Sequence, residues 1–170
     1  MPKFGLLRDH LLEIGLAEEH DFVRPELPNR SVIERVHDPD YLNAFIDGTL
    51  DRDAIRRIGL PWSPALVRRT ITAIGGTLRT TQLAVEHGLA CNTAGGTHHA
   101  HAAFGSGFCI LNDLAVAARF ALDQGLARRV LVIDLDVHQG DGTAAIFDRI
   151  HDVYTFSMHG KDNYPLHKEQ

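Results

Sequence analysis

Residues 130–142 read VLVIDLDVHQGDG, and this stretch decides the fold class. It begins with a nearly continuous apolar run, VLVIDL, which is typical of a strand buried on both faces of a parallel sheet. Asp141-Gly142 then opens a helix to about Phe147, and VYTFSM at 153–158 predicts the next strand. A strand, a helix and a strand at this spacing indicate a parallel α/β sheet with right-handed crossovers.

The same alternation extends toward the N-terminus. Residues 89–93 predict a strand, and residues 95–107 predict a loop rich in Gly and His. Asn112 or Asp113 is expected to cap a helix that runs to Leu122. Three successive strands are therefore expected, with a loop or a helix between them.

The preceding part of the chain predicts mainly helices. Ser63-Pro64 is a strong helix start, and this helix is expected to run to the residue before Gly88. Gly75-Gly76 within it indicates either a kink or a close approach to another backbone, and the sequence leaves both open. The other expected elements are helices at 4–14 and 41–46, a short strand at 31–36 and turns at 47–62.

The composition favours one soluble domain. The 170 residues suffice for a single core, the formal net charge of −5 gives no basic surface for nucleic acid, and the two cysteines form no disulfide framework. Because the N-terminus lacks an apolar signal segment and no stretch is long enough to span a membrane, we expect a cytoplasmic protein. The 11 histidines are unusual, and His10, His20 and His37 among them are expected at the surface.

Polar clusters follow each of the three expected strands. His98-His99 comes after the first, the segment DLDVH at 134–138 ends the second, and Ser157 lies at the end of the third. In open α/β sheets, ligands bind at the carboxyl ends of the strands. We therefore expect His, Asp and Ser side chains to meet at one edge of the sheet.

Asp136 and His138 are candidate metal ligands. Residues two apart in an extended segment point to the same side, so a carboxylate oxygen and an imidazole nitrogen can converge on one cation. This pair suits Zn²⁺, and a catalytic zinc generally has three protein ligands and an open position for water or substrate. A D-x-H triplet alone is common and often has no function, so the interpretation depends on its neighbours.

Asp134 ends an apolar run, where an unpaired carboxylate would be costly. A histidine is the obvious partner, because such a carboxylate orients an imidazole and raises its basicity. His98 and His99 with Asp134 and Asp141 would make two His–Asp pairs, one acting as general base on a metal-bound water and the other as acid or electrostatic stabiliser. Taken without the DLDVH segment, the two histidines are better explained as exposed loop residues, or as a metal site built from the histidines themselves.

Three ordered blocks together resemble the histone deacetylase family, which includes bacterial acetylpolyamine and acetoin-utilisation amidohydrolases. The blocks are GGTHHAHAAFGSGFCILND at 95–113, VIDLDVHQGDGTAAIF at 132–147 and YTFSMHGKDNYP at 154–165. Gln139 and the segment GLACNTAGGTHH at 88–99 look closest to the class IV deacetylases and their bacterial relatives. The resemblance covers roughly 68–165, and more weakly 36–41, and it implies a three-layer, parallel-sheet α/β fold of the arginase/deacetylase type.

The resemblance implies roles for individual residues. Asp136 and His138 match two of the family's three zinc ligands. His98 and His99 match its tandem active-site histidines, of which the second is usually taken as the general base. The carboxylates that match the partners of these histidines are Asp134 and Asp141.

The resemblance also implies a substrate tunnel and a second cation site. Gly107 and Phe108 match a pair that lines the acyl tunnel, in which the Gly carbonyl faces the substrate amide and the Phe forms one wall. Tyr164 falls near the opposite wall. A structural K⁺ site near the zinc, built largely from backbone carbonyls, is the other expectation. The residues that match it are Asp134, Asp136, His138, Ser157 and Met158.

Two functional groups of the family have no match in this sequence. The third zinc ligand of the family is a downstream Asp, and the Tyr that polarises the acyl carbonyl lies later still. Asp162 sits in the loop expected to wall the tunnel, and we do not assign it as a substitute ligand. We therefore expect residues 1–170 to form a single partial deacetylase domain, incomplete at both ends, with its core motifs at 91–165.

The function implied by the resemblance is zinc-dependent hydrolysis of an N-acyl amide, such as an acetyl amide, on lysine or a polyamine-like amine. We expect the 170-residue chain itself to be inactive or weakly active. A manganese ureohydrolase of the arginase type remains open, although it would lack the HH and GFC blocks. A non-catalytic metal-binding or interaction module, or one half of a complemented enzyme, is the third alternative, and homo-oligomer formation is left open.

Overall fold

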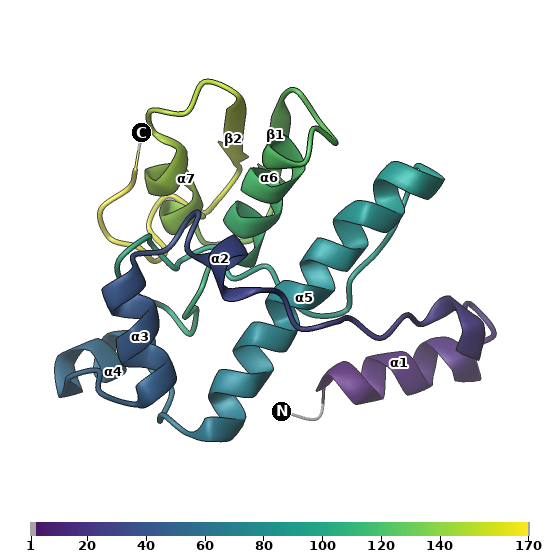
Figure 1. Ribbon diagram of the computed structural model, residues 1–170, viewed down its shortest axis with the longest axis horizontal. Helices are drawn as coiled ribbons and strands as arrows, with labels where there is room; N and C mark the ends of the chain where they lie inside the picture. Colours follow the sequence, from purple (N-terminus) through teal and green to yellow (C-terminus); the bar gives the residue numbers. More distant parts are fainter. Residues whose placement is uncertain (1–2, 170) are drawn as a thin grey trace.

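The computed structural model describes residues 3–169 as a set of helices joined to a small parallel sheet (Figure 1). The first half contains α1 (Lys3–Glu13), a 3-10 turn (Glu19–Asp21), α2 (Arg30–Ile33), α3 (Pro39–Asp47), α4 (Arg52–Ile58) and the long α5 (Pro64–His87). The second half contains α6 (Asp113–Asp123), β1 (Val130–Asp134), α7 (Asp141–Phe147) and β2 (Val153–Ser157). No helix of this described part is long and apolar enough to cross a membrane.

The sheet that residues 3–169 form has two parallel strands, β1 and β2. Val130 pairs with Val153, and the register continues to Asp134 opposite Ser157. Helix α7 connects the strands and packs on β2, while α6 packs on β1 (Figure 1). The predicted parallel α/β arrangement is confirmed, and it places Asp134 and Ser157 at the same carboxyl edge.

One face of this sheet carries the core and the other is open. On the inner face, Val153 packs with Phe147 of α7 and with alanines of α6. On the outer face, Leu131 is 57% exposed and Tyr154 is 69% exposed. The prediction that the VLVIDL strand is buried on both faces is therefore wrong for this chain, because α6 and α7 cover a single face.

Three short elements also differ from the sequence-based expectations. Residues 89–93 form irregular chain instead of a strand, and Asn92 Oδ1 accepts a hydrogen bond from Ala94 N that turns the backbone locally. The predicted strand at 31–36 begins as α2, which buries Ile33 in the core. The predicted turns at 47–62 contain α4, whose N-terminus is capped by the Asp51 side chain.

Helix α5 follows its prediction closely. The Ser63 side chain caps it, Pro64 is its first residue, and Gly88 ends it in the left-handed conformation at φ 87°. Gly75-Gly76 does not break the helix. A Cβ on Gly75 would lie 2.2 Å from the carbonyl oxygen of Glu26, so the close approach to another backbone is the reading that the structure supports.

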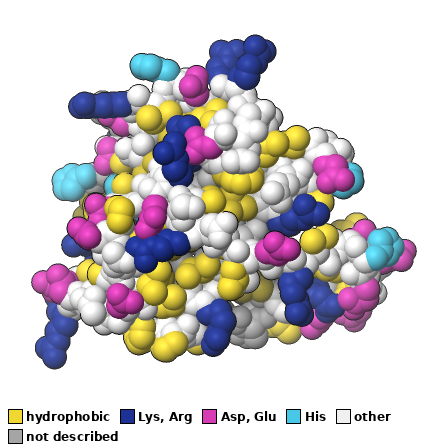
Figure 2. Space-filling view, viewed as in Figure 1, with side chains coloured by type: hydrophobic (Ala, Val, Ile, Leu, Met, Phe, Trp, Pro, Cys, Tyr) yellow, Lys and Arg dark blue, Asp and Glu magenta, His cyan; other side chains and the backbone are white. Residues whose placement is uncertain are grey.

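Two apolar clusters meet at α6. One lies among the N-terminal helices and α5 and includes Phe45, Ile74 and Val116, and the other lies under the sheet and includes Ala115. Helix α6 therefore joins the helical body to the sheet. On the face of the molecule shown in Figure 2, basic and acidic side chains are interspersed among apolar ones.

Candidate active site

The loop between α5 and α6 brings two histidines to the carboxyl end of β1. His98 Nδ1 lies 2.5 Å from Asp134 Oδ2, and His99 Nδ1 lies 2.6 Å from Asp141 Oδ1 at the first residue of α7. The two imidazole rings are neighbours, with centroids 4.1 Å apart. Both histidines are buried, so each His–Asp pair is a charge-assisted contact largely shielded from water.

Asp141 also approaches a third histidine, since His101 Nε2 lies 3.4 Å from Asp141 Oδ2. Burial of Asp141 raises its pKa, but the hydrogen bonds from His101 and His99 outweigh burial and bring the pKa below its ordinary value. An ionised Asp141 accepts the Nδ1–H of His99, and this leaves Nε2 of a neutral His99 as the free basic nitrogen. The sequence reasoning missed His101, although its H-x-H spacing to His99 was visible.

Asp136 and His138 lie beside these pairs. His138 Nδ1 is 3.2 Å from Asp136 Oδ1, and the His138 and His99 rings have centroids 5.9 Å apart. The backbone N–H of His138 donates to Asp136 at 2.8 Å, and this hydrogen bond lowers the pKa of the carboxyl. An ionised carboxylate next to an imidazole is a donor set that zinc binds in proteins.

The spacing of these two donor atoms fits zinc. Two ligand atoms at 2.0–2.2 Å in a tetrahedral arrangement lie about 3.4 Å apart. The 3.2 Å between Asp136 Oδ1 and His138 Nδ1 is close to that value, and both side chains are about half exposed, so their donor atoms are accessible. Across residues 3–169, however, no group of three His, Cys, Asp or Glu side chains comes together as a metal site.

The predicted tunnel residues are only partly brought together. A Cβ on Gly107 would lie 2.8 Å from His99 Cδ2 and 3.1 Å from Tyr164 Cε1, so Gly107 packs directly between these rings. Tyr164 meets His99 edge-on, with centroids 4.9 Å apart, and its hydroxyl bonds to Ser106. Phe108 instead lies at the C-terminal end of α4, 67% exposed, where its N–H donates to the carbonyl oxygen of Ile58.

The residues predicted for K⁺ gather around the end of β1. Asp134 and Ser157 both line a cavity of about 250 Å³. Ser157 Oγ lies 2.9 Å from His159 Nδ1, and the backbone N–H of Met158 donates to the carbonyl oxygen of Asp134. Gln139 closes the other side through hydrogen bonds to the backbone of Glu169.

The prediction that His37 lies at the surface is wrong. Its side chain is 2% exposed, Nε2 accepts the backbone N–H of Asn112 at 2.9 Å, and Nδ1 lies 3.1 Å from the carbonyl oxygen of Ala102. Burial lowers the pKa of His37 to about 4, so it is a neutral histidine inside the fold. His10 and His20 are exposed, as predicted.

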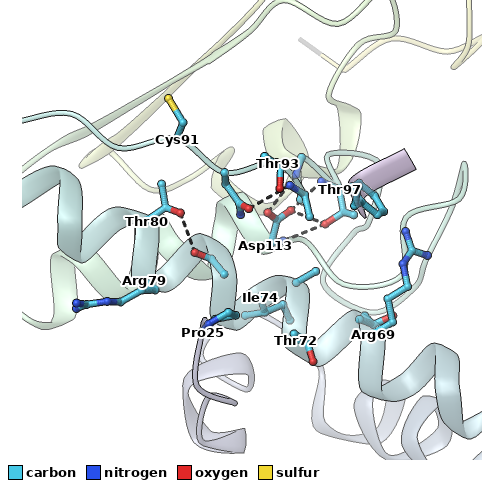
Figure 3. Close-up of a pocket in the computed structure, with 18 of the residues that line it drawn as sticks. Pro25, Arg69, Thr72, Ile74, Arg79, Thr80, Cys91, Thr93, Thr97 and Asp113 are labelled. Atoms are coloured by element: carbon cyan, nitrogen blue, oxygen red, sulfur yellow. Dashed lines mark hydrogen bonds between the residues drawn. The ribbon is translucent and has the colours of Figure 1, made fainter. Parts of the chain in front are cut away.

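A larger groove, of about 900 Å³, runs along α5 (Figure 3). Its walls include Arg69, Arg79 and Thr80 of α5, and its inner end is the loop before His98. Neither His–Asp pair nor the Asp136–His138 pair lines this groove. We therefore place the candidate active site at the carboxyl end of β1.

Comparisons with known proteins identify the family of this chain. The family model "Histone deacetylase domain" matches residues 2–170. An uncharacterised protein of Picosynechococcus is 59% identical over the whole of this chain, and the match covers 57% of that protein. The acetoin utilization protein AcuC of Staphylococcus aureus is 32% identical over 96% of this chain, and the match covers 45% of AcuC. The chain thus spans about half the length of the curated relatives it matches.

A solved structure gives the same result for the fold. The crystal structure of an HDAC homolog from Aquifex aeolicus superposes on 97% of this chain with a TM-score of 0.84 and 26% sequence identity, and the match covers 47% of that chain. The α/β fold with its parallel sheet is therefore the deacetylase fold, over about half of its extent. The family model and these relatives together show that the chain belongs to the histone deacetylase family.

Proposed function

We propose that this chain carries the proton-transfer machinery and part of the zinc site of an enzyme that hydrolyses N-acyl amides, such as acetyl amides. The observation that carries the proposal is the pair of buried His–Asp contacts, His98–Asp134 and His99–Asp141, next to the Asp136–His138 pair. Amide hydrolysis needs an activated water, a base to take its proton and an acid for the leaving amine. Two adjacent histidines with separate carboxylate partners fit the second and third of these needs.

The two His–Asp pairs have different surroundings, which suits different roles. Asp141 accepts hydrogen bonds from both His99 and His101, and Gly107 packs against the His99 ring. The His99 ring lies beside the ring of His138, with centroids 5.9 Å apart, and His99 is therefore assigned as the base that takes a proton at Nε2. His98, held by Asp134, is assigned to stabilise charge or to return the proton to the amine.

Asp136 and His138 would hold the zinc, which when bound supplies Lewis-acid polarisation of the water and of the acyl oxygen. The described residues bring only these two ligands together, and a catalytic zinc generally has three from the protein. We therefore propose that the 170-residue chain taken alone binds zinc weakly and has little or no turnover.

The remaining expectations are part of the same proposal. The substrate is an acyl-lysine or an acylated polyamine-like amine, and Asp134 and Ser157 contribute to a K⁺ site at the cavity beside them. A cytoplasmic location, no direct binding to nucleic acid, and homo-oligomer formation as an open alternative stay predictions. The family match does not favour a manganese ureohydrolase or a non-catalytic module.

Zinc titration combined with a fluorogenic acetyl-lysine assay tests the proposal. Zinc binding is measured by competition with a chromogenic chelator for the wild-type chain, Asp136→Asn and His138→Ala. Both variants should bind zinc more weakly. Any zinc-dependent turnover should fall by roughly 10²–10⁴-fold in His99→Ala, because a general base is lost.

His10→Ala is the matched control, because His10 is an exposed histidine on α1 far along the chain from the site. It should change neither zinc binding nor turnover. Zinc affinity unaltered in both Asp136→Asn and His138→Ala would overturn the assignment of the ligands. Robust turnover by the bare chain would refute the weak activity proposed for it.

A further inference from the structure

We propose that Asn112 and Asp113, two adjacent residues at the start of α6, are positioning residues that hold the His98–His99 segment from both sides. Asp113 binds the backbone immediately before the histidines, and Asn112 binds the backbone immediately after them. This inference rests on the proposed function, because it explains how the two proton-transfer groups are oriented.

Asp113 secures the approach to His98. Its carboxylate accepts the backbone N–H of Gly96 at 3.1 Å and that of Thr97 at 2.7 Å, and it also lies 2.5 Å from both the Thr97 and Thr77 hydroxyls. The Thr77 contact ties the arrangement to α5. Figure 3 shows the Asp113 carboxylate among the residues that line the groove, with dashed lines that join it to Thr97.

The close fit at Gly95 shows how tightly this turn is held. Gly95 has a φ of 101°, and a Cβ there would lie 2.4 Å from Asp113 Oδ2. Only glycine suits both the backbone angle and the space. The Gly95-Gly96 turn can therefore wrap around the carboxylate, and the direction in which the chain leaves toward His98 is fixed.

Asn112 secures the chain on the far side of the histidines. Its Nδ2 donates to the carbonyl oxygen of Ala100 at 3.0 Å and to Thr143 Oγ1 at 2.9 Å. The backbone N–H of Thr143 in turn donates to the carbonyl oxygen of His98 at 3.1 Å. Through Thr143, the same side chain links the histidine segment to α7, the helix that carries Asp141.

Because Asn112 and Asp113 are buried, the loss of any of these hydrogen bonds should be costly. Asn112 is 0% and Asp113 is 1% exposed, so water does not replace a lost partner. Asn112 Oδ1 already accepts the backbone N–H of Ala115 as the cap of α6, and its own N–H is held by His37. Each polar atom of the pair has one assigned partner or more, and an isosteric change must leave a buried group unsatisfied.

The test uses two isosteric variants of the full chain, Asp113→Asn and Asn112→Asp. Hydrogen exchange measured by mass spectrometry follows the amides of residues 94–102. Because an amide group cannot accept hydrogen bonds at both of its ends, Asp113→Asn should speed exchange in this segment by roughly tenfold to a hundredfold. Asn112→Asp loses the donor to Ala100 and should act in the same direction.

A spectroscopic readout separates positioning from loosening of the fold. The Nδ1–H protons of the two His–Asp contacts are expected as strongly downfield proton resonances, because both contacts are short. Both variants should shift or lose these signals while the amides of α3 keep wild-type exchange. Neither readout needs zinc or turnover, so failure of the proposed function leaves the test of positioning intact.

Asp123→Asn is the matched control. It makes the same chemical change at the other end of α6, where Asp123 bonds to Arg35 and Arg119 at the surface. It should leave exchange of residues 94–102 and the downfield signals unaltered. Wild-type exchange and wild-type signals in both Asp113→Asn and Asn112→Asp would overturn the proposal.

If Asp113→Asn does not fold, Thr97→Val provides a milder change. It removes the hydroxyl that contacts the Asp113 carboxylate, the Leu111 carbonyl oxygen and the backbone N–H of Asp113, but it leaves the backbone N–H contacts of Gly96 and Thr97. Exchange in residues 94–102 should then rise by roughly a few-fold, less than in Asp113→Asn, because the carboxylate keeps both of its backbone N–H partners. An unchanged rate in Thr97→Val overturns the role of Asp113.

Discussion

Replacing His37 by Gln should weaken the fold and remove much of its sensitivity to mild acid. In the wild-type chain, His37 Nε2 accepts the N–H of Asn112, and Nδ1–H donates to the carbonyl oxygen of Ala102. A Gln side chain keeps an acceptor near the position of Nε2 but has no donor at the position of Nδ1. His37→Gln therefore leaves the Ala102 carbonyl without its side-chain partner.

The size of the effect at neutral pH follows from burial. An unsatisfied buried acceptor costs about 1–3 kcal/mol, and the 2% exposure of His37 leaves little room for water to substitute. The free energy of unfolding should fall by that amount at pH 7.5. For a domain whose total stability is about 5–15 kcal/mol, this is a measurable fraction.

The pH dependence adds a second, independent signature. Burial lowers the pKa of His37 from 6.5 to about 4, so between these values the unfolded chain takes up a proton that the folded chain excludes. Stability from this residue is complete above about pH 6.5 and is lost as the pH falls toward 4. Since one pKa unit corresponds to 1.36 kcal/mol, the total loss is about 3 kcal/mol.

Urea unfolding followed by circular dichroism at pH 7.5, 6.0 and 5.0 measures both effects. The difference between wild type and His37→Gln should shrink as the pH falls, because Gln does not titrate. Other histidines and carboxylates contribute equally to both proteins and cancel in the difference. A constant difference across this pH range would show that His37 is not a buried neutral histidine.

Four further substitutions have defined outcomes. Gly75→Ala should lower the free energy of unfolding, measured by urea denaturation, by about 1–2 kcal/mol, because the added Cβ meets the Glu26 carbonyl. Gly5→Ala on α1, where no atom lies within 4 Å of the added Cβ, should instead raise it by up to about 1 kcal/mol. Gly142→Ala should lower the thermal midpoint by about 2–12 °C, because its Cβ would lie 2.3 Å from the Ala100 carbonyl oxygen. Gly107→Ala should shift the ring-proton resonances of Tyr164, because the added Cβ would lie between the His99 and Tyr164 rings. Unshifted resonances would contradict that packing.

The sequence was sufficient to predict the features that depend on local pattern. Helix α5 begins and ends at its predicted caps, and β1 and β2 lie where the apolar runs place them. That Asp134 pairs with a histidine was also predictable, because a carboxylate at the end of an apolar strand needs a donor, and the structure identifies this histidine as His98. Each of these inferences depends only on residues within a short segment: a cap at a helix end, an apolar run, or a carboxylate that needs a partner.

Features that depend on distant contacts were not predictable. The segment 89–93 has the apolar pattern of a strand, but Asn92 bonds to Thr77 of α5 and to the following backbone. His37 has polar neighbours in sequence, and only the fold brings Asn112 and Ala102 onto its ring. In both cases side-chain hydrogen bonds from another element decide the outcome, and no local periodicity records them.

The polar groups at the start of α6 also fix the position of this helix between the two apolar clusters that it joins. Apolar contacts on either side of α6 tolerate small shifts, because they are not directional. The hydrogen bonds of Asn112, Asp113 and Thr143 do not tolerate them, since each buried partner would be left unsatisfied. In the part of the chain that the structure describes, no buried side-chain nitrogen or oxygen lacks a partner. The same contacts that fix the helical body against the sheet therefore fix the two histidines against their carboxylates.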